Sequence, residues 1–177
     1  MFDALPDAAR LWIFPLDRSL DAAEAGALAQ SVAGWLPTWR SHGRPVAAGV
    51  EVLAGRALAV GAVISQAEAS RQADAVNAGV SGCGIDAMER AVADALGALG
   101  VGLAPPLGVL YRGADGGWQS APRPAFRRRV REGAAGPETP ILDVTPQTVG
   151  ALRASGPERP AGETWAARAF GMAPTRA

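Results

Sequence analysis

Cys83 is the only cysteine of the 177-residue chain, and a glycine stands on each side of it. Residues 81–85 come directly before a stretch with helical periodicity. The backbone N–H groups and the dipole at a helix N-terminus stabilise negative charge. Thiols in such places tend to react more readily, because the thiolate is the reactive form of cysteine. The pattern predicts a nucleophilic or redox thiol at Cys83, or an anion site formed by the backbone of Ser81, Gly82 and Gly84.

Two further side chains could assist such a thiol. His42 is the only imidazole of the chain, and Asp86 follows Cys83 by three residues. A catalytic Cys–His pair needs its two groups within hydrogen-bond reach, and a carboxylate can orient the ring. The alternative is structural, because free cysteines are among the most buried residue types. In that interpretation Cys83 fills a tight turn, Asp86 only caps the helix, and His42 bonds to backbone carbonyls in its own turn.

A cluster of arginines is the second feature with chemical potential. All 17 basic residues of the chain are arginine, and six of them lie between residues 112 and 131. If residues 124–131 form a helix, its outer face could present arginines to phosphate groups. The alternative is a solvated helix face, since no aromatic side chains alternate with these arginines. Nucleic-acid binding would use Arg123, Arg127, Arg128 and Arg131, and it has less support from the sequence than chemistry at Cys83.

Composition excludes several classes of function. The chain has no lysine, which rules out a Walker A phosphate loop, a Schiff base and a pyridoxal-phosphate anchor. One cysteine and one histidine cannot form a structural zinc site or an intramolecular disulfide. We therefore predict no metal and no cofactor. A formal net charge of zero provides no general attraction to nucleic acid or to anionic membranes.

The sequence also predicts a cytoplasmic location without membrane association. Asp3 and Asp7 precede the first arginine, whereas a secretory signal begins with positive charge. The longest mainly aliphatic run, residues 57–64, is far shorter than the roughly 20 residues that cross a bilayer. A single unpaired cysteine is consistent with a reducing compartment.

Hydrophobic periodicity and helix-boundary signals predict the elements that must position these residues. The spacing of Asp21 and Glu24 is that of a capping box, and Pro37 should end the first long helix near Leu36. Asp86 and Glu89 repeat this spacing before the second long helix. A long loop is expected over 65–80. Strands are expected over 11–14, 46–53, 57–64, 107–112, around Trp118 and over 141–144, with a short helix from Pro124 to Arg131.

The order of these elements predicts an α+β fold. Strand, helix, strand, strand, helix, strand is the ferredoxin-like β-α-β-β-α-β pattern, an antiparallel sheet covered on one face by two helices. We expect this core over residues 1–112. Residues 113–177 would then add a hairpin strand, a short helix, a last strand and a tail, packed on the core as one globular unit. Trp165 and Phe170 are expected to anchor the tail.

Six short segments, scattered over most of the chain, carry a resemblance to a known family. They are Leu11-Trp12-Ile13-Phe14, Asp17-Arg18-Ser19-Leu20, Trp39 with His42-Gly43, Ser81-Gly82-Cys83-Gly84-Ile85-Asp86, Thr139-Pro140-Ile141-Leu142-Asp143 and Thr164-Trp165-Ala166-Ala167-Arg168. In this order they resemble a small family of uncharacterised bacterial proteins, best populated in Bacteroidetes and often labelled "ABC transporter ATPase". The resemblance implies a shared fold and draws attention to Cys83. It implies no ATP hydrolysis, because the phosphate-binding motif and its lysine are absent.

Because these classes of catalytic site are absent from the sequence, a binding function is the main expectation. Without a metal cluster, a phosphate loop or a complete triad, we expect a non-catalytic α+β domain that binds a protein partner or a small ligand, which could be anionic. The alternative is a cysteine-dependent enzyme or thiol redox protein centred on Cys83. An exposed apolar surface would support the first expectation, whereas the second requires a thiol that is open to solvent. The sequence predicts no substrate and no oligomeric state.

Overall fold

The computed structural model describes residues 2–64 and 79–172, and its fold is of the α+β class. The chain divides into two compact units. Unit 1 contains Met1–Leu103 and Thr145–Ser155, and unit 2 contains Ala104–Val144 and Gly156–Ala177. The first unit therefore ends at Leu103 and not at residue 112, where the boundary was expected. It also contains a second segment, Thr145–Ser155, from a later part of the chain.

The sheet of unit 1 has three strands. They are β1 (Arg10–Pro15), β4 (Ala47–Leu53) and β5 (Ala57–Val63), in the order β1-β5-β4. Both outer strands run antiparallel to β5. Every residue of β5 is buried, as its continuous apolar sequence requires of a central strand. The strands expected in this part of the chain are confirmed.

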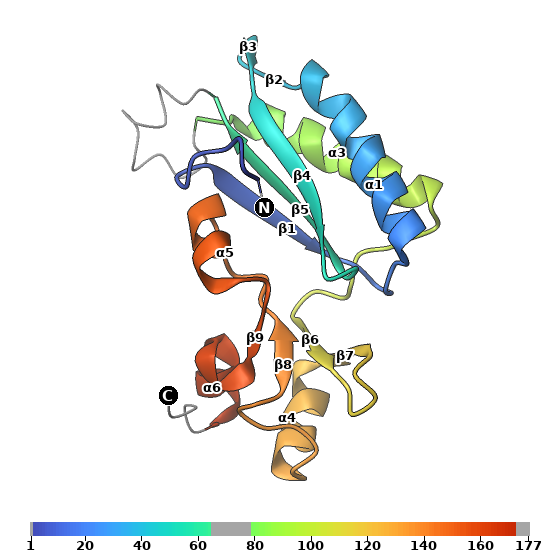
Figure 1. Cartoon of the computed structure of the whole chain (residues 1–177), viewed down its shortest axis with the longest axis vertical. Coiled ribbons are helices and arrows are strands. Elements are labelled where there is room, and N and C mark those ends of the chain that lie inside the picture. The colour runs from blue at the N-terminus through green and yellow to red at the C-terminus, as the bar shows by residue number, and fades with distance from the viewer. Residues whose placement is uncertain (1, 65–78, 173–177) are drawn as a thin grey trace. The chain divides into compact units, whose positions relative to one another are not determined.

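Two helices cover one face of this sheet (Figure 1). Helix α1 (Ala22–Trp35) begins with the expected capping box: the Asp21 carboxylate accepts from the Glu24 N–H at 2.8 Å, and the Glu24 carboxylate accepts from the Asp21 N–H at 3.1 Å. The 3-10 turn η1 (Leu36–Thr38), which contains Pro37, comes next. The α-helix thus ends near Leu36, as expected from the proline.

Helix α3 (Gly82–Ala98) begins five residues earlier than expected. Its N-cap is Ser81, whose hydroxyl accepts a hydrogen bond from the Gly84 N–H at 3.2 Å. The expectation that Asp86 caps this helix is therefore wrong. Asp86 lies within the helix and is exposed, because the serine hydroxyl already satisfies a free N–H of the first turn.

The core of unit 1 lies between the sheet and these helices. It contains Leu28 and Val32 of α1, Met88 and Val92 of α3, and Trp39, all nearly inaccessible to solvent. The opposite face of the sheet is also covered. A Cβ atom added to Gly61 in β5 would lie 2.9 Å from side-chain carbons of both Leu5 and Val149. The N-terminal segment and helix α5 (Val149–Ser155) therefore pack closely on that face.

The strand expected over 107–112 does not join the sheet of unit 1. Strand β6 (Gly108–Arg112) pairs instead with β7 (Trp118–Pro122) and β8 (Pro140–Leu142). Strand β9 (Glu158–Pro160) completes a second sheet of order β7-β6-β8-β9. The expected hairpin between β6 and β7 is confirmed, but the expected partner of β6 was wrong because apolar sequence alone does not specify which strand it pairs with.

Unit 2 has its own aromatic core. Helix α4 (Arg123–Arg131) places Phe126 between Tyr111 and Phe170. The centre of the Phe126 ring lies 5.1 Å from that of Tyr111 and 5.0 Å from that of Phe170. Phe170 ends α6 (Trp165–Phe170), which comes after the 3-10 turn η2 (Ala161–Glu163). The elements α5, β9 and α6 were not expected, since they are short and lie in a stretch rich in glycine and proline. No helix in 2–64 or 79–172 is long and apolar enough to cross a membrane.

Candidate functional site

The N-terminal end of α3 carries most of the residues singled out in the sequence. Cys83 is the second residue of the helix, and its side chain is exposed. Gly82 has open space beside it, because a Cβ added there would meet no atom within 4 Å. Gly84 is buried: a Cβ there would lie 3.2 Å from Val80 Cγ1 and 3.4 Å from Ser41 Cβ. Close packing therefore accounts for Gly84, whereas Cys83 faces solvent.

A small hairpin binds this end of α3. It consists of β2 (Arg40–Ser41) and β3 (Arg44–Pro45). The Ser81 N–H donates to Ser41 Oγ at 2.9 Å, and the buried Trp39 Nε1–H donates to the Gly84 carbonyl at 2.9 Å. These bonds give Ser41, Ser81 and Gly84 clear structural roles.

His42 lies in the turn of this hairpin. It adopts a left-handed backbone conformation with φ of 49° and is exposed. Because its neighbour Ser41 bonds to Ser81, the hairpin brings His42 to the same end of α3 as Cys83 and Asp86. Within residues 2–64 and 79–172, no hydrogen bond or ion pair joins any two of these three side chains. The long loop expected over 65–80 lies, up to residue 78, outside the described residues.

The arginine cluster of α4 makes contacts within unit 2. The Arg123 guanidinium lies 4.7 Å from the centre of the Trp165 ring, and that of Arg127 lies 5.9 Å from the Phe170 ring. Arg127 also donates to the Ala169 carbonyl at 3.2 Å. Arg128 lies 4.0 Å from Glu132, and Arg131 is exposed. Two of the four predicted phosphate-binding arginines thus cover aromatic rings of their own unit.

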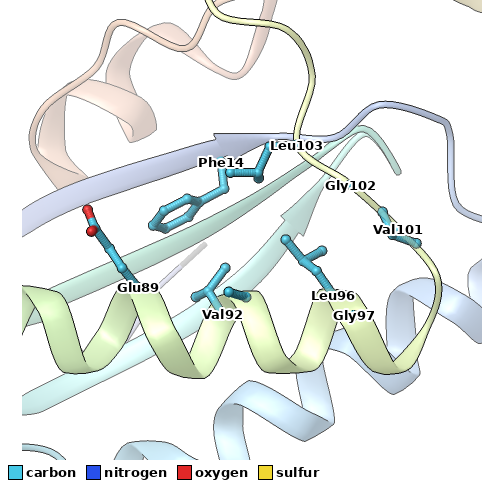
Figure 2. Close-up of a pocket in the computed structure, with 9 residues that line it drawn as sticks. Phe14, Glu89, Val92, Leu96, Gly97, Val101, Gly102 and Leu103 are labelled. Carbon is cyan, nitrogen blue, oxygen red and sulfur yellow. The ribbon is translucent and has the colours of Figure 1, made fainter.

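An apolar groove lies beside β1 in unit 1 (Figure 2). Its volume is about 460 Å³. The lining comes from the end of β1, from one face of α3 and from the segment directly after α3. The lining residues are Phe14, Glu89, Val92, Ala93, Leu96, Gly97, Val101, Gly102 and Leu103.

Small residues of α3 create the space for this groove. Ala93 and Gly97 follow Glu89 at intervals of four residues, so the three lie along one stripe of the helix. A Cβ added to Gly97 would meet no atom within 4 Å. Leu103, which also lines the groove, is 54% exposed. Glu89 is the only charged residue in the lining.

Sequence reasoning missed this groove. The helical periodicity of α3 marks Val92 and Leu96 as core residues, and it gives no sign that the space above them is open. A signal was nevertheless present in the stripe of Glu89, Ala93 and Gly97, since two small residues beside a core face leave room for a ligand. Only the position of β1 relative to α3 turns that stripe into a groove.

A second groove, of about 420 Å³, lies at the opposite edge of the sheet, beside β4. Its lining contains no charged side chain. The lining residues are Ala33, Leu36, Pro37, Val46, Ala48, Gly49 and Val50.

The charged groups whose pKa values are shifted line neither groove. A hydrogen bond from Arg18 is the main cause that lowers the pKa of Glu24, and the same bond raises the pKa of Arg18. Burial lowers the pKa of Arg56, whose side chain is 3% exposed, against the attraction of Asp17. These groups act in structure rather than at the groove, and in the described ranges no cluster of histidine, cysteine and carboxylate side chains could hold a metal ion.

Comparison of the chain with protein-family models, with curated proteins and with solved structures found no match. A function for this chain must therefore be argued from its own geometry.

Proposed function

We propose that unit 1 is a binding module and that the groove between β1 and α3 holds its ligand, an apolar small molecule or an apolar segment of a partner protein. The observation that carries this proposal is the groove itself. Its volume falls within the range of about 300–1,000 Å³ that ligand pockets occupy. Its lining is apolar apart from Glu89, and a single polar group among apolar side chains can orient a ligand.

An interrupted strand would account for the groove. We propose that unit 1 is a ferredoxin-like fold in which unit 2 is inserted into the fourth strand. Leu103 forms an antiparallel bridge with Leu16 at one end of β1, and Thr148 forms one with Arg10 at the other end. The chain between Leu103 and Thr148 is mostly unit 2. Among the described residues, the position that a complete fourth strand would fill is thus occupied only at its two ends.

The groove can contribute binding energy chiefly through burial of apolar surface. Removal of a leucine-sized side chain from water contributes about 1.5–3 kcal/mol. Part of this gain is available from the protein side as well, because Leu103 exposes more than half of its surface in the free chain.

A matched pair of variants tests the proposal. Gly97→Leu places a large side chain in the groove, whereas Gly26→Leu makes the same change on an exposed position of α1 where a Cβ also meets no atom within 4 Å. The readout is the fluorescence of Nile red, an uncharged apolar dye. We expect the natural protein and Gly26→Leu to bind the dye alike and Gly97→Leu to lose binding. Equal binding by all three proteins would exclude the groove as the site.

The second candidate is chemistry at Cys83, and its exposure is the observation that favours it. A solvent-accessible thiol is a requirement of any cysteine-dependent enzyme or redox protein. The predicted assistance by His42 and Asp86 gains support only from their common location at the start of α3. The rate of Cys83 alkylation in the natural protein and in His42→Ala tests this candidate, because a thiol that the imidazole activates should react more slowly without it.

A further inference from the structure

The outer edge of β1 carries backbone hydrogen-bonding groups that the described part of the chain uses only at the two ends of the strand. The Leu11 N–H donates to the Gln147 carbonyl at 2.9 Å, and the Asp17 N–H donates to the Gly102 carbonyl at 2.9 Å. Along a strand, alternate residues direct their N–H and C=O groups to the same edge. The N–H and C=O of Ile13 therefore point outward too, and none of the described residues pairs with them there.

The groove of Figure 2 lies on the helix side of this open edge. Phe14, the next residue of β1, faces the groove, whereas Ile13 offers its backbone to the edge. A ligand in this position can thus do two things at once: it can pair with the backbone of β1 and direct alternate side chains into the groove. Unpaired strand edges next to apolar grooves are sites where extended peptides add as a further strand.

We propose that the ligand of this groove is an extended peptide segment of a partner protein, of which three residues add antiparallel to β1 in the space between Leu103 and Gln147. This inference rests on the proposed function and specifies its ligand. The antiparallel direction follows from the chain itself, because the bridges at Leu103 and Thr148 both run antiparallel to β1.

The register defines which side chains the peptide presents. A residue opposite Phe14 directs its side chain into the groove, toward Val92 and Leu96, and is apolar. The next residue lies opposite Ile13 and exchanges two backbone hydrogen bonds with it. The third residue lies opposite Trp12 and again faces the helix side.

The negative charge of Glu89 favours a basic side chain at the third peptide residue, the one opposite Trp12. Figure 2 shows Glu89 on one side of Phe14 and Leu103 on the other. Since β1 ends near Leu103, a peptide antiparallel to β1 runs from Leu103 toward Glu89. No ion pair or hydrogen bond within the described residues engages the Glu89 carboxylate. A lysine or arginine opposite Trp12 complements it, so the recognised sequence is apolar residue, any residue, basic residue.

The edge of β4 is a weaker candidate for such a peptide. The groove beside it has no charged lining residue, so it offers nothing that would select a direction or a sequence. The edge of β1 offers apolar space, unpaired backbone and one charge in a defined order.

The test uses the full chain and a fluorescein-labelled Leu-Thr-Arg amide, which has three residues because Leu103 and Gln147 already occupy the positions opposite Leu16 and Leu11. Fluorescence anisotropy gives its dissociation constant. Two modified peptides serve as controls: one carries an N-methyl group on the threonine between leucine and arginine, and the other has glutamate in place of arginine. We expect each change to weaken binding by about tenfold or more, which corresponds to loss of about 1.4 kcal/mol.

Protein variants complete the design. Glu89→Arg should reverse the preference, so that it binds the glutamate peptide more tightly than the arginine peptide. Gly97→Leu should weaken binding of the arginine peptide, and Gly26→Leu should not. A site that bound only the side chains would tolerate N-methylation better, because the change removes a donor at the strand edge and leaves the leucine and arginine side chains unchanged.

Three results would overturn the inference. If Nile red binds in the groove and no peptide does, the proposed function stands and the peptide ligand is wrong. If the N-methylated peptide binds as tightly as the parent peptide, the ligand does not pair with β1. If neither dye nor peptide binds, or if the chain only pairs with a second copy of itself, both proposals fail.

Discussion

The hydroxyl oxygens of Ser41 and Ser81 lie 3.0 Å apart, and the Ser81 N–H donates to Ser41 Oγ at 2.9 Å. Forty residues separate the two serines in the chain. Through this contact the β2–β3 hairpin is joined to the N-cap of α3, which in turn accepts from the Gly84 N–H. The start of the helix that carries both Cys83 and the groove is therefore defined by a tertiary bond.

Replacement of Ser41 should weaken the contact between the β2–β3 hairpin and the N-cap of α3. Ser41→Ala leaves the Ser81 N–H without its acceptor, and we expect a loss of about 1–3 kcal/mol in the free energy of unfolding. Urea denaturation measures the change. Ser19→Ala is the control, since Ser19 is exposed and no described hydrogen bond involves its hydroxyl. Equal stability of the two variants would show that the serine pair is not a stabilising contact.

The Arg18–Glu24 pair should make stability depend on pH. Two hydrogen bonds of 2.9 and 2.8 Å from Arg18 hold the pKa of Glu24 below its ordinary value of 4.5. A lowered folded-state pKa contributes stability that is present above pH 4.5 and is lost as the pH falls through the folded-state value. Glu24→Gln should therefore lose less stability than the natural protein between pH 6 and about pH 3, as measured by urea titrations at each pH.

The contrasting control for that experiment is Asp94→Asn, because Asp94 lies on the exposed face of α3 and takes part in no described ion pair. It should behave like the natural protein over the same pH range. A Glu24→Gln variant with the same acid sensitivity as Asp94→Asn would contradict the assigned role of the pair.

Cys83 should react with iodoacetamide in the folded protein at a rate comparable to that in denaturant, because its side chain is exposed. Mass spectrometry monitors the reaction, and the chain has no other thiol. We expect His42→Ala to leave this rate unchanged, since no hydrogen bond joins the two side chains. A marked slowing in His42→Ala would instead favour a thiol–imidazole pair and the enzymatic alternative.

Arg123 should act as a structural residue of unit 2. Its guanidinium covers the Trp165 ring at 4.7 Å, and loss of an exposed cation–π contact costs about 0.5–1 kcal/mol. Arg123→Gln should lower the free energy of unfolding by this amount in urea denaturation. Arg131→Gln serves as the exposed comparison on the same helix and should have little effect.

The same two variants test the nucleic-acid hypothesis. We expect the natural chain to show no salt-sensitive binding to oligo(dT) between 50 and 200 mM NaCl, a range in which six phosphate contacts to a single strand would change affinity about three hundredfold. Tight binding at low salt that both arginine variants weaken would revive that hypothesis.

Local signals predicted local structure well. The capping box at Asp21 and Glu24 and the break at Pro37 act within a few residues of the chain, so sequence alone was sufficient to place the first helix. The second helix shows the limit. Ser81 and Asp86 both carry N-cap signals, and the contact from Ser41 favours Ser81.

Pairing between distant segments could not be predicted in the same way. The apolar residues Val109, Leu110 and Tyr111 identify β6 as a strand, but they fit either sheet equally well. For the same reason the groove was invisible in the sequence. It forms where Phe14 of β1 faces Val92 and Leu96 of α3, and among the described residues no complete strand continues the sheet beyond β1.

The most direct test of the binding function is an NMR titration of the ¹⁵N-labelled chain with 2-naphthol, a small apolar probe. The account predicts that amide shifts gather at Phe14 and along residues 92–103, and that they disappear in Gly97→Leu. Shifts confined to residues 46–50 beside β4, or no shifts at all up to the solubility of the probe, would contradict it.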